Sequence, residues 1–166
     1  AWYPGQAGNA IADVLFGDYN AAGRLPVTFY GSVSDLPAFD DYRMAGRTYR
    51  FFKGQPLYPF GHGLSYTTFR YDRVKLSAPK IDADGAVQVT VKVKNTGKRA
   101  SDEVVQMYVQ HLGSSVTRPQ LELKGFKRVR IAPGAVQDVT MELKVRDLAY
   151  WDTASHAWKV EKEQVR

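Results

Sequence analysis

The sequence predicts a mainly β protein, an antiparallel β-sandwich preceded by a helix and a strand from the end of an α/β unit. Three observations predict this fold. After residue 86, apolar and polar residues alternate in several short runs, as in half-buried strands. Before residue 19, apolar residues instead recur at the spacing of one helical face. Between the two parts lies a stretch rich in aromatic rings, prolines and glycines.

The first 30 residues predict a loop, a helix and a short strand. The apolar face of the helix includes Ile11 and Val14, and Gly17 stands where a left-handed C-terminal cap is expected. Residues 24–30, RLPVTFY, are a short apolar run that predicts a strand. One helix and one strand cannot cover each other's apolar faces, so we expect this part to need a further surface. The apolar side chains concerned are Ile11, Val14, Leu15, Phe16, Leu25, Val27 and Phe29.

Residues 46–69 predict a stiff, packed connector. Seven of these 24 residues are Phe or Tyr, and prolines and glycines are interspersed among them. Prolines fix the backbone, glycines permit turns and close approach, and rings supply large apolar areas. The segment is therefore expected to be neither a regular helix nor a long strand, but a link held between two bodies.

The rest of the chain predicts about seven short strands separated by turns, as in an antiparallel sandwich. The strand signals lie at residues 69–76, 87–94, 105–110, 121–132, 139–145, 150–151 and 158–160. Gly125 interrupts the fourth of them. We expect one shared core made by Val87, Val89, Val91, Val93, Val105, Met107, Val109, Val139, Met141 and Leu143.

The connector also carries a resemblance to a known family. Residues 56–69, PLYPFGHGLSYTTF, resemble the segment of glycoside hydrolase family 3 that joins the second catalytic domain to a fibronectin type III-like domain. Residues 23–28, GRLPVT, and 102–109, DEVVQMYV, resemble the flanking domains. The resemblance implies that residues 1–69 are the C-terminal remnant of an α/β sandwich domain with its connector. It implies an immunoglobulin/fibronectin type III-like domain at residues 70–166.

By this resemblance, the chain is expected to be the C-terminal segment of a retaining exo-β-glycosidase. Its substrates would be terminal β-xylosyl or β-glucosyl residues of plant-polysaccharide oligosaccharides. Residues 40–42 and 46–52 look most like the β-xylosidase side of the family. The family places its nucleophile on a preceding barrel and its acid/base earlier in the sandwich domain. Neither position is matched here, so the chain alone is expected to be inactive. The alternative is a non-catalytic accessory module that binds polysaccharide or spaces domains.

The expected partners follow from the same resemblance. They are the remaining domains of the same enzyme or a complementary chain, and an oligosaccharide bound by the whole enzyme. The formal net charge of +6 does not predict nucleic-acid binding, because Lys and Arg are spread among Asp and Glu. No apolar run is long enough to predict a membrane span. We expect a periplasmic or secreted protein, with the cytoplasm as the alternative, since the absence of cysteine decides neither.

No cofactor and no metal site are predicted. The three histidines, His62, His111 and His156, lie far apart in the sequence without a carboxylate at ligand spacing. We expect each of them to be hydrogen-bonded or exposed. Without cysteine the chain also has no thiolate ligand or nucleophile.

The predicted substrate-binding residues lie in two places. Sugars are held by ring faces and hydrogen-bonding groups, and the loop at residues 37–52 offers both. A second set stands just before the first helix, where free backbone N–H groups gather. The candidates are Trp2, Tyr3, Gln6, Tyr42, Arg43, Arg47 and Tyr49, with packing as the alternative role for each. Asp35, Asp40 and Asp41 are expected to be turn and cap residues, or partners of the neighbouring arginines.

Overall fold

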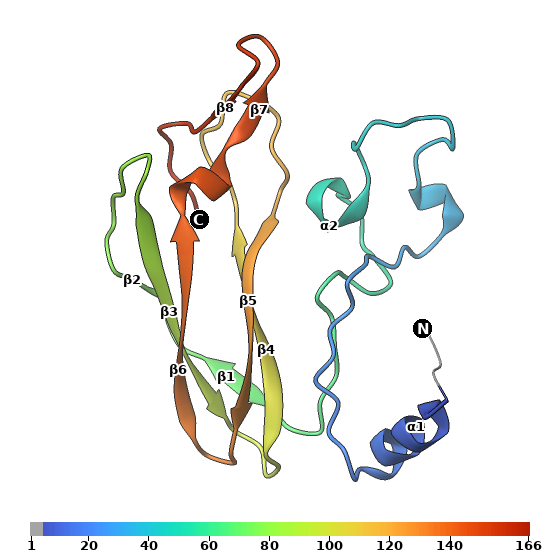
Figure 1. Cartoon of the computed structure of the whole chain (residues 1–166). Helices are drawn as coiled ribbons and strands as arrows, with labels where there is room; N and C mark the ends of the chain where they lie inside the picture. The colour runs from blue at the N-terminus through green and yellow to red at the C-terminus, as the bar shows by residue number, and fades with distance from the viewer. Residues whose placement is uncertain (1–4) are drawn as a thin grey trace.

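The computed structural model describes residues 5–166 and places a β-sandwich beside a smaller N-terminal part (Figure 1). The helices are α1 (Ala7–Phe16), η1 (Val33–Asp35), α2 (Thr48–Phe51) and η2 (Val145–Leu148). The strands are β1 (Phe69–Tyr71), β2 (Lys75–Leu76), β3 (Ala86–Asn95), β4 (Ser101–Val109), β5 (Glu122–Ile131), β6 (Val136–Lys144), β7 (Tyr150–Asp152) and β8 (Ala157–Lys159).

All strand pairs of the sandwich are antiparallel among the described residues. One sheet is built on β3, which pairs with β6 on one edge and with β1 and β2 on the other. The second sheet consists of β4 and β5. A small hairpin of β7 and β8 extends from one end of the sandwich (Figure 1). The predicted mainly β, antiparallel fold is confirmed.

The core between the two sheets consists of the residues that the alternation predicts. Burial alternates along β4 without a break, so every second side chain faces inward. Eight of the ten predicted side chains are buried, and Val89 and Met141 are partly buried against them. Val129 and Ile131 of β5 complete this core.

Gly125 marks an irregularity in the β4–β5 pair. The register shifts between Met107 and Tyr108, opposite Gly125. A side chain at this glycine would approach the Met107 methyl group to 3.2 Å. The predicted interruption of this strand is therefore a β-bulge on β5, which buries Val129 and Ile131 on one side of the bulge and Glu122 on the other.

The predicted first helix and its cap are confirmed. Gly17 adopts φ 86°, and its N–H donates to the carbonyls of Asp13 and Val14, which closes the last turn of α1. Few other contacts tie α1 to the chain. The Tyr66 hydroxyl donates to the Val14 carbonyl at 2.6 Å, and Arg99 donates to the Gly17 carbonyl at 3.0 Å.

The predicted strand at residues 24–30 is wrong. This segment is extended and lies beside residues 57–62, but the two are joined by only one isolated bridge, Phe29 with Tyr58. Leu25 exchanges backbone hydrogen bonds with Gly61 and His62. Pro26 and Pro59 stand between these two points of pairing and have no N–H to donate, so no regular ladder forms.

The predicted packed connector is confirmed, and it lies against the outer face of β4. Its only helix within residues 46–68 is the four-residue turn α2. The Tyr49 ring stacks on Phe60 at 4.2 Å, and both rings meet the edge or face of Tyr108. The Gly61 carbonyl accepts a hydrogen bond from the Gln106 side chain at 3.1 Å. The connector therefore covers one side of the sandwich rather than only linking two bodies.

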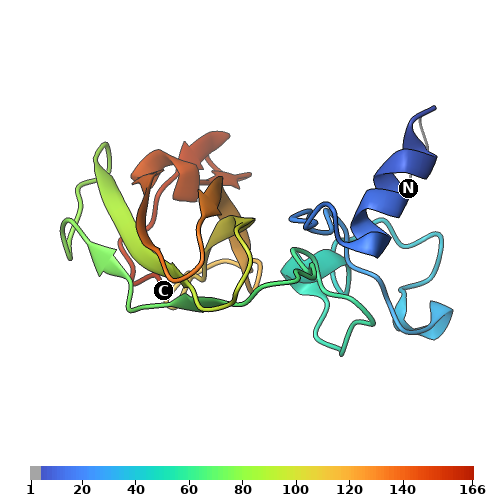
Figure 2. The same cartoon turned by 90° about the horizontal axis from the view of Figure 1, so that it is seen from below.

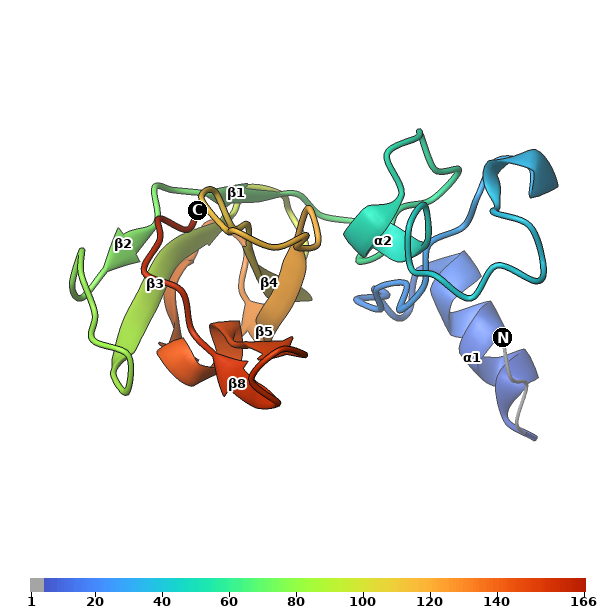
Figure 3. The ribbon, with the colours of Figure 1, turned by 90° about the horizontal axis from the view of Figure 1, so that it is seen from above.

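Two arginines join the N-terminal part to the sandwich. Arg24 pairs with Glu103 at 2.5 Å, and Arg128 donates to the Tyr19 hydroxyl at 2.9 Å. Two views turned by 90° show the N-terminal part beside the sandwich rather than wrapped around it (Figures 2 and 3).

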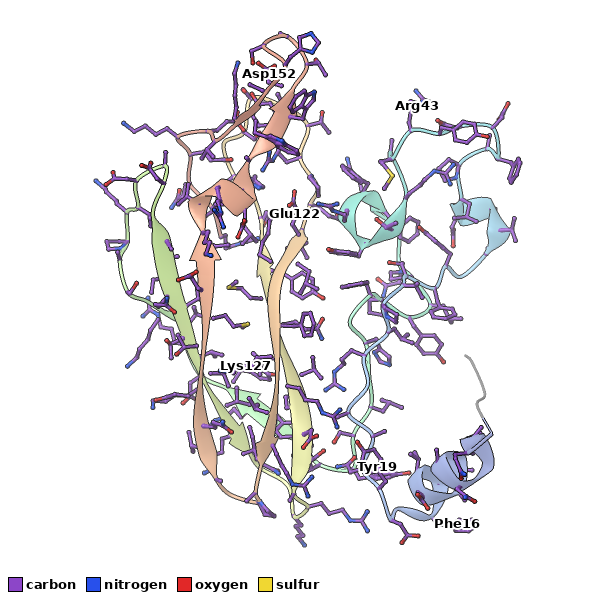
Figure 4. All side chains as sticks on the ribbon, in the orientation of Figure 1. Phe16, Tyr19, Arg43, Glu122, Lys127 and Asp152 are labelled. Carbon is purple, nitrogen blue, oxygen red and sulfur yellow. The ribbon has the colours of Figure 1, made fainter. Side chains whose placement is uncertain are left out.

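The apolar faces of the N-terminal part remain open, as predicted. Leu15 and Phe16 are 72% and 84% exposed. Ile11, Val27 and Phe29 are about half exposed, and Val14 and Leu25 are partly buried. Phe16 lies on α1, at the end of the molecule far from most of the sandwich (Figure 4). The chain itself therefore does not bury any of these seven side chains fully.

Candidate functional site

The loop at residues 37–47 is organised around one arginine. The Arg47 guanidinium donates to the carbonyls of Ala38, Asp41 and Arg43, at 3.3, 2.5 and 3.1 Å. Gly46, the residue before Arg47, adopts φ 73°, a left-handed conformation that glycine takes without strain. The Arg47 guanidinium thus hydrogen-bonds to three backbone carbonyls of the loop. This candidate residue holds the loop in shape and has few donors left for a ligand.

Asp41 and Arg43 form a pair within this loop. The Arg43 Nε and Nη2 donate to the Asp41 carboxylate at 2.9 and 2.8 Å, and the Arg43 N–H donates at 3.0 Å. These hydrogen bonds hold the pKa of Asp41 well below its ordinary value. Asp41 is therefore the partner of an arginine, as predicted. A carboxylate with so low a pKa is a poor proton acceptor at neutral pH.

The other two acidic residues differ from each other. The Asp35 side chain accepts from the Ser32 N–H at 3.0 Å and completes a capping box at η1, so its predicted cap role is confirmed. Asp40 is exposed beside Asp41. Asp41, with its lowered pKa, does not have the environment of a general acid, which needs a raised pKa.

Two aromatic rings of the loop face outward. Tyr42 is 91% exposed and Phe39 is 99% exposed, and 83% of the Arg43 side chain is accessible. Arg43 lies at the top of the N-terminal part (Figure 4). Exposed ring faces beside a guanidinium can stack on and hydrogen-bond to a sugar. Phe39 was not among the predicted residues, although its position between a proline and two aspartates was a signal for an exposed loop ring.

The remaining candidates are distributed differently. Tyr49 is partly buried, and its hydroxyl accepts from the Leu123 N–H at 3.0 Å. Gln6 lies at the start of α1, where its side chain accepts from Asn9 at 3.0 Å. Trp2 and Tyr3 lie outside the described residues. The structure brings Tyr42, Arg43 and Arg47 together in one loop and places Gln6 apart from them, on α1. A substrate-binding role for all seven residues stays a prediction.

Two hollows lie beside the connector. One, of about 680 Å³, lies between the connector and β4 and includes Tyr49, Arg24 and Glu103. The other, of about 970 Å³, lies between α2 and the β7–β8 hairpin and includes Arg50 and Trp158. Sequence reasoning predicted neither hollow, because each is made by segments more than 90 residues apart.

The histidines have separate environments, and none of them meets another. The His111 side chain is buried, with Nδ1 at 2.6 Å from Glu163 and Nε2 at 2.6 Å from Arg118. His156 is exposed in the β7–β8 turn, and His62 lies against the Tyr58 ring. Within residues 5–166, no group of three or more His, Asp or Glu side chains could hold a metal ion. No helix in that range is long and apolar enough to cross a membrane.

Comparison with known proteins gives two family matches. The family described as "Glycosyl hydrolase family 3 C-terminal domain" matches residues 1–66. The "Fibronectin type III-like domain" matches residues 103–166. The two matches follow each other along the chain in the order that the sequence predicts. The exact division at residues 69 and 70 stays a prediction.

Curated relatives match almost the whole chain. A "Periplasmic beta-glucosidase" of Salmonella typhimurium is 43% identical over 91% of this chain and 21% of its own length. A "Xylan 1,4-beta-xylosidase" of Xylanibacter ruminicola is 44% identical over 96% of this chain and 18% of its own length. The chain thus spans about a fifth of the length of the curated relatives it matches.

Solved structures agree with these matches. The chain superposes on the β-glucosidase EmGH1 of Erythrobacter marinus with a TM-score of 0.80 and 43% identity, over 93% of this chain and 21% of the other. It superposes on the β-D-glucoside glucohydrolase of Trichoderma reesei with a TM-score of 0.83 and 30% identity, over 96% of this chain and 26% of the other.

Proposed function

The chain belongs to glycoside hydrolase family 3 as a C-terminal part, and we propose that it serves a retaining exo-β-glycosidase. The whole enzyme removes terminal β-glucosyl or β-xylosyl residues from oligosaccharides of plant polysaccharides. This part supports the preceding α/β domain and contributes the loop at residues 37–47 to the edge of the substrate site. The enzyme acts in the periplasm or outside the cell.

One observation carries this proposal: a single chain joins both matched domains through the aromatic connector and superposes as one unit on β-glucosidases. A free-standing accessory module, the alternative, would have no need of part of an α/β domain with an open apolar face. The matches to β-glucosidases and β-xylosidases therefore support the enzyme over the module.

The arrangement of the loop supports binding rather than proton transfer. Retaining hydrolysis needs one carboxylate as nucleophile and a second carboxyl group as acid/base. Asp41 is held as an ion by Arg43, and Asp35 caps η1. The loop instead offers Tyr42 and Arg43 at its surface. We therefore assign both catalytic carboxyl groups to other parts of the whole enzyme.

The partner of the open apolar face is the rest of the same enzyme. Leu15 and Phe16 each have about 1.5–3 kcal/mol to gain from burial. Relatives are about five times longer than this chain and carry the additional domains on one polypeptide. A complementary separate chain would bury the same face, so the two arrangements differ in covalent connection and not in chemistry.

The test is expression of the whole reading frame that contains this chain, next to the 166-residue chain alone. The whole protein is expected to hydrolyse 4-nitrophenyl β-glucoside or β-xyloside, with the β-configuration retained in the first product seen by NMR. The chain alone is expected to hydrolyse neither. Hydrolysis by the chain alone would overturn the proposal, as would a whole protein that is folded but inert on both substrates.

A further inference from the structure

Gln120, which lies just before β5 of the sandwich, holds the short helix α2 by three hydrogen bonds. The Gln120 side-chain amide donates to the carbonyls of Tyr49 and Phe52 at 2.9 and 2.7 Å, and the Gln120 N–H donates to the Arg50 carbonyl at 2.8 Å. Carbonyls at a helix end have no partner within the helix. A single residue, about 70 positions later in the sequence, therefore satisfies three of them.

The next residues of the sandwich strengthen this attachment. The Leu123 N–H donates to the Tyr49 hydroxyl at 3.0 Å. Glu122, whose side chain is 9% exposed, pairs with Arg50 at 3.3 Å, and it lies on the side of β5 that faces α2 (Figure 4). Residues 120–123 thus form one attachment point, the β5 start, for residues 49–52.

The turn held in this way is strained at its first residue. Thr48 adopts φ 54°, a left-handed conformation that a β-branched residue rarely takes. Its N–H donates to the Tyr30 hydroxyl at 2.6 Å. Such a conformation persists only when the surroundings fix it, and strained residues of this kind cluster at functional sites. The β5 start and Tyr30 hold the turn on two sides.

The strained residue Thr48 directly follows the candidate loop in the sequence. Arg47 precedes Thr48, and its guanidinium fastens the carbonyls of Ala38, Asp41 and Arg43. A change in the backbone at Thr48 therefore turns Arg47 and, with it, the exposed Tyr42 and Arg43. The position of these outward groups depends on a chain of contacts that begins in the sandwich.

We propose that Gln120 is a positioning residue for substrate binding. Through α2 and Arg47 it sets the place of Tyr42 and Arg43, and this is how the fibronectin type III-like domain contributes to the affinity of the enzyme for its sugar. The part about affinity rests on the proposed function. The part about the position of the loop does not, and it can be measured on the 166-residue chain.

Two variants and one control separate this role from plain packing. Gln120→Glu keeps the shape but replaces two amide donors by an acceptor facing two carbonyls, and Gln120→Ala removes the side chain. Gln137→Ala, on the exposed face of β6, is the matched control. If Gln120 contributed only by packing, Gln120→Glu would behave like the wild type.

The first measurement is amide hydrogen exchange of the isolated chain. Loss of the Gln120 donors is expected to speed exchange at residues 43–52 by about tenfold, because each hydrogen bond contributes modestly and local opening reports their sum. Exchange at Val93 and Val139, in the core, should stay unchanged. Unchanged exchange at residues 43–52 in both variants would overturn the proposal.

The second measurement is kinetics of the whole enzyme. Both variants are expected to raise KM about tenfold and to leave kcat within about twofold, since the chemistry lies elsewhere. Faster exchange with an unchanged KM would overturn the role in affinity. A wild-type enzyme inert on both substrates would instead refute the proposed function, and the exchange result would still decide whether Gln120 positions the loop.

Discussion

Arg24 and Glu103 form an ion pair of 2.5 Å that is almost closed to solvent, with 14% and 9% of the two side chains exposed. The pair links the N-terminal part to β4. The Tyr71 hydroxyl donates to the other carboxylate oxygen at 2.6 Å. Burial and this hydrogen bond raise the pKa of Tyr71, so its hydroxyl remains a donor at any ordinary pH.

The first prediction follows from this pair. Arg24→Met leaves the buried carboxylate without its cation, which is expected to cost about 3–5 kcal/mol of unfolding free energy. The double variant Arg24→Met with Glu103→Met should recover most of the loss, because an apolar pair needs no compensation. Urea unfolding of the isolated chain measures both. A loss below about 1 kcal/mol in the single variant would contradict the prediction.

The second prediction concerns a fully buried amide. The Asn95 Nδ2 donates to the carbonyls of Arg99 and Ile131 at 2.7 and 2.9 Å, and its Oδ1 accepts from Thr67 and Gly97 at 2.7 and 3.0 Å. Asn95→Asp removes both donors and turns an acceptor towards two carbonyls. It should cost about 3 kcal/mol or more at pH 7.

The loss of unfolding free energy in Asn95→Asp should depend on pH. The new carboxyl is buried, so its pKa in the folded state is raised above that of the unfolded chain. The destabilisation of Asn95→Asp should therefore be smaller at pH 3.5 than at pH 7, measured against the wild type at each pH. A loss that is equal at both pH values would show that the pKa of the new carboxyl is the same in the folded and the unfolded chain, and it would contradict the prediction.

The third prediction tests the contact between the connector and β4. Gly61 adopts φ 80°, and a side chain there would meet Gln106 and the Tyr108 hydroxyl, the latter at 2.7 Å. Gly61→Ala is expected to cost about 2 kcal/mol or more from backbone strain and displaced side chains together. Gly134→Ala has the same strain, at φ 74° in an open turn. A clearly larger loss at Gly61 isolates the steric part, and equal losses would refute it.

The sandwich core could be predicted from sequence because period-two burial is a local property. Val87, Val93 and Val139 needed only their neighbours in the chain to be assigned to one face. The failure at residues 24–30 has an equally local cause, since Pro26 prevents the ladder that the apolar run suggested. Propensity favoured a strand there, and the missing N–H groups decided otherwise.

The candidate site was predicted only in part, because its contacts are long-range. The loop chemistry of Tyr42 and Arg43 is visible in the sequence. The hydrogen bonds of Gln120 and Arg47 to backbone carbonyls could not be predicted, because every residue has a carbonyl and its type does not show which one is bonded. Residue identity likewise gave no sign that Glu122 would meet Arg50 across about 70 positions.

The fourth prediction concerns the C-terminal tail at acid pH. The hydroxyls of Ser114 and Ser115 and the Ser115 N–H donate to Glu161 and lower the pKa of its carboxyl from 4.5 to about 2. A lowered pKa means that the stabilisation is complete above about 4.5 and is lost as the pH falls towards 2.

The measurement compares the unfolding free energies of wild type and Glu161→Gln at pH 6 and pH 2.5. The wild type should be more stable at pH 6, and the gap should narrow at pH 2.5. Gln137→Ala, an exposed change on β6 that removes no titrating group, should show no such narrowing. A gap for Glu161→Gln that is independent of pH would mean that this carboxylate does not hold the tail.

The last prediction distinguishes an open apolar face from an ordinary exposed one. Leu15 and Phe16 are 72% and 84% exposed in this chain, so replacing both by Ala should change its unfolding free energy by no more than about 0.5 kcal/mol. In the whole enzyme the same two changes should cost about 4–8 kcal/mol, because each side chain is then buried against another domain. Val93→Ala, in the sandwich core, is the control and should destabilise both proteins alike. The contrast depends on location and not on residue type, since all three changes shorten an apolar side chain. A loss in the whole enzyme as small as that in the isolated chain would show that α1 stays exposed there and that its apolar face binds nothing.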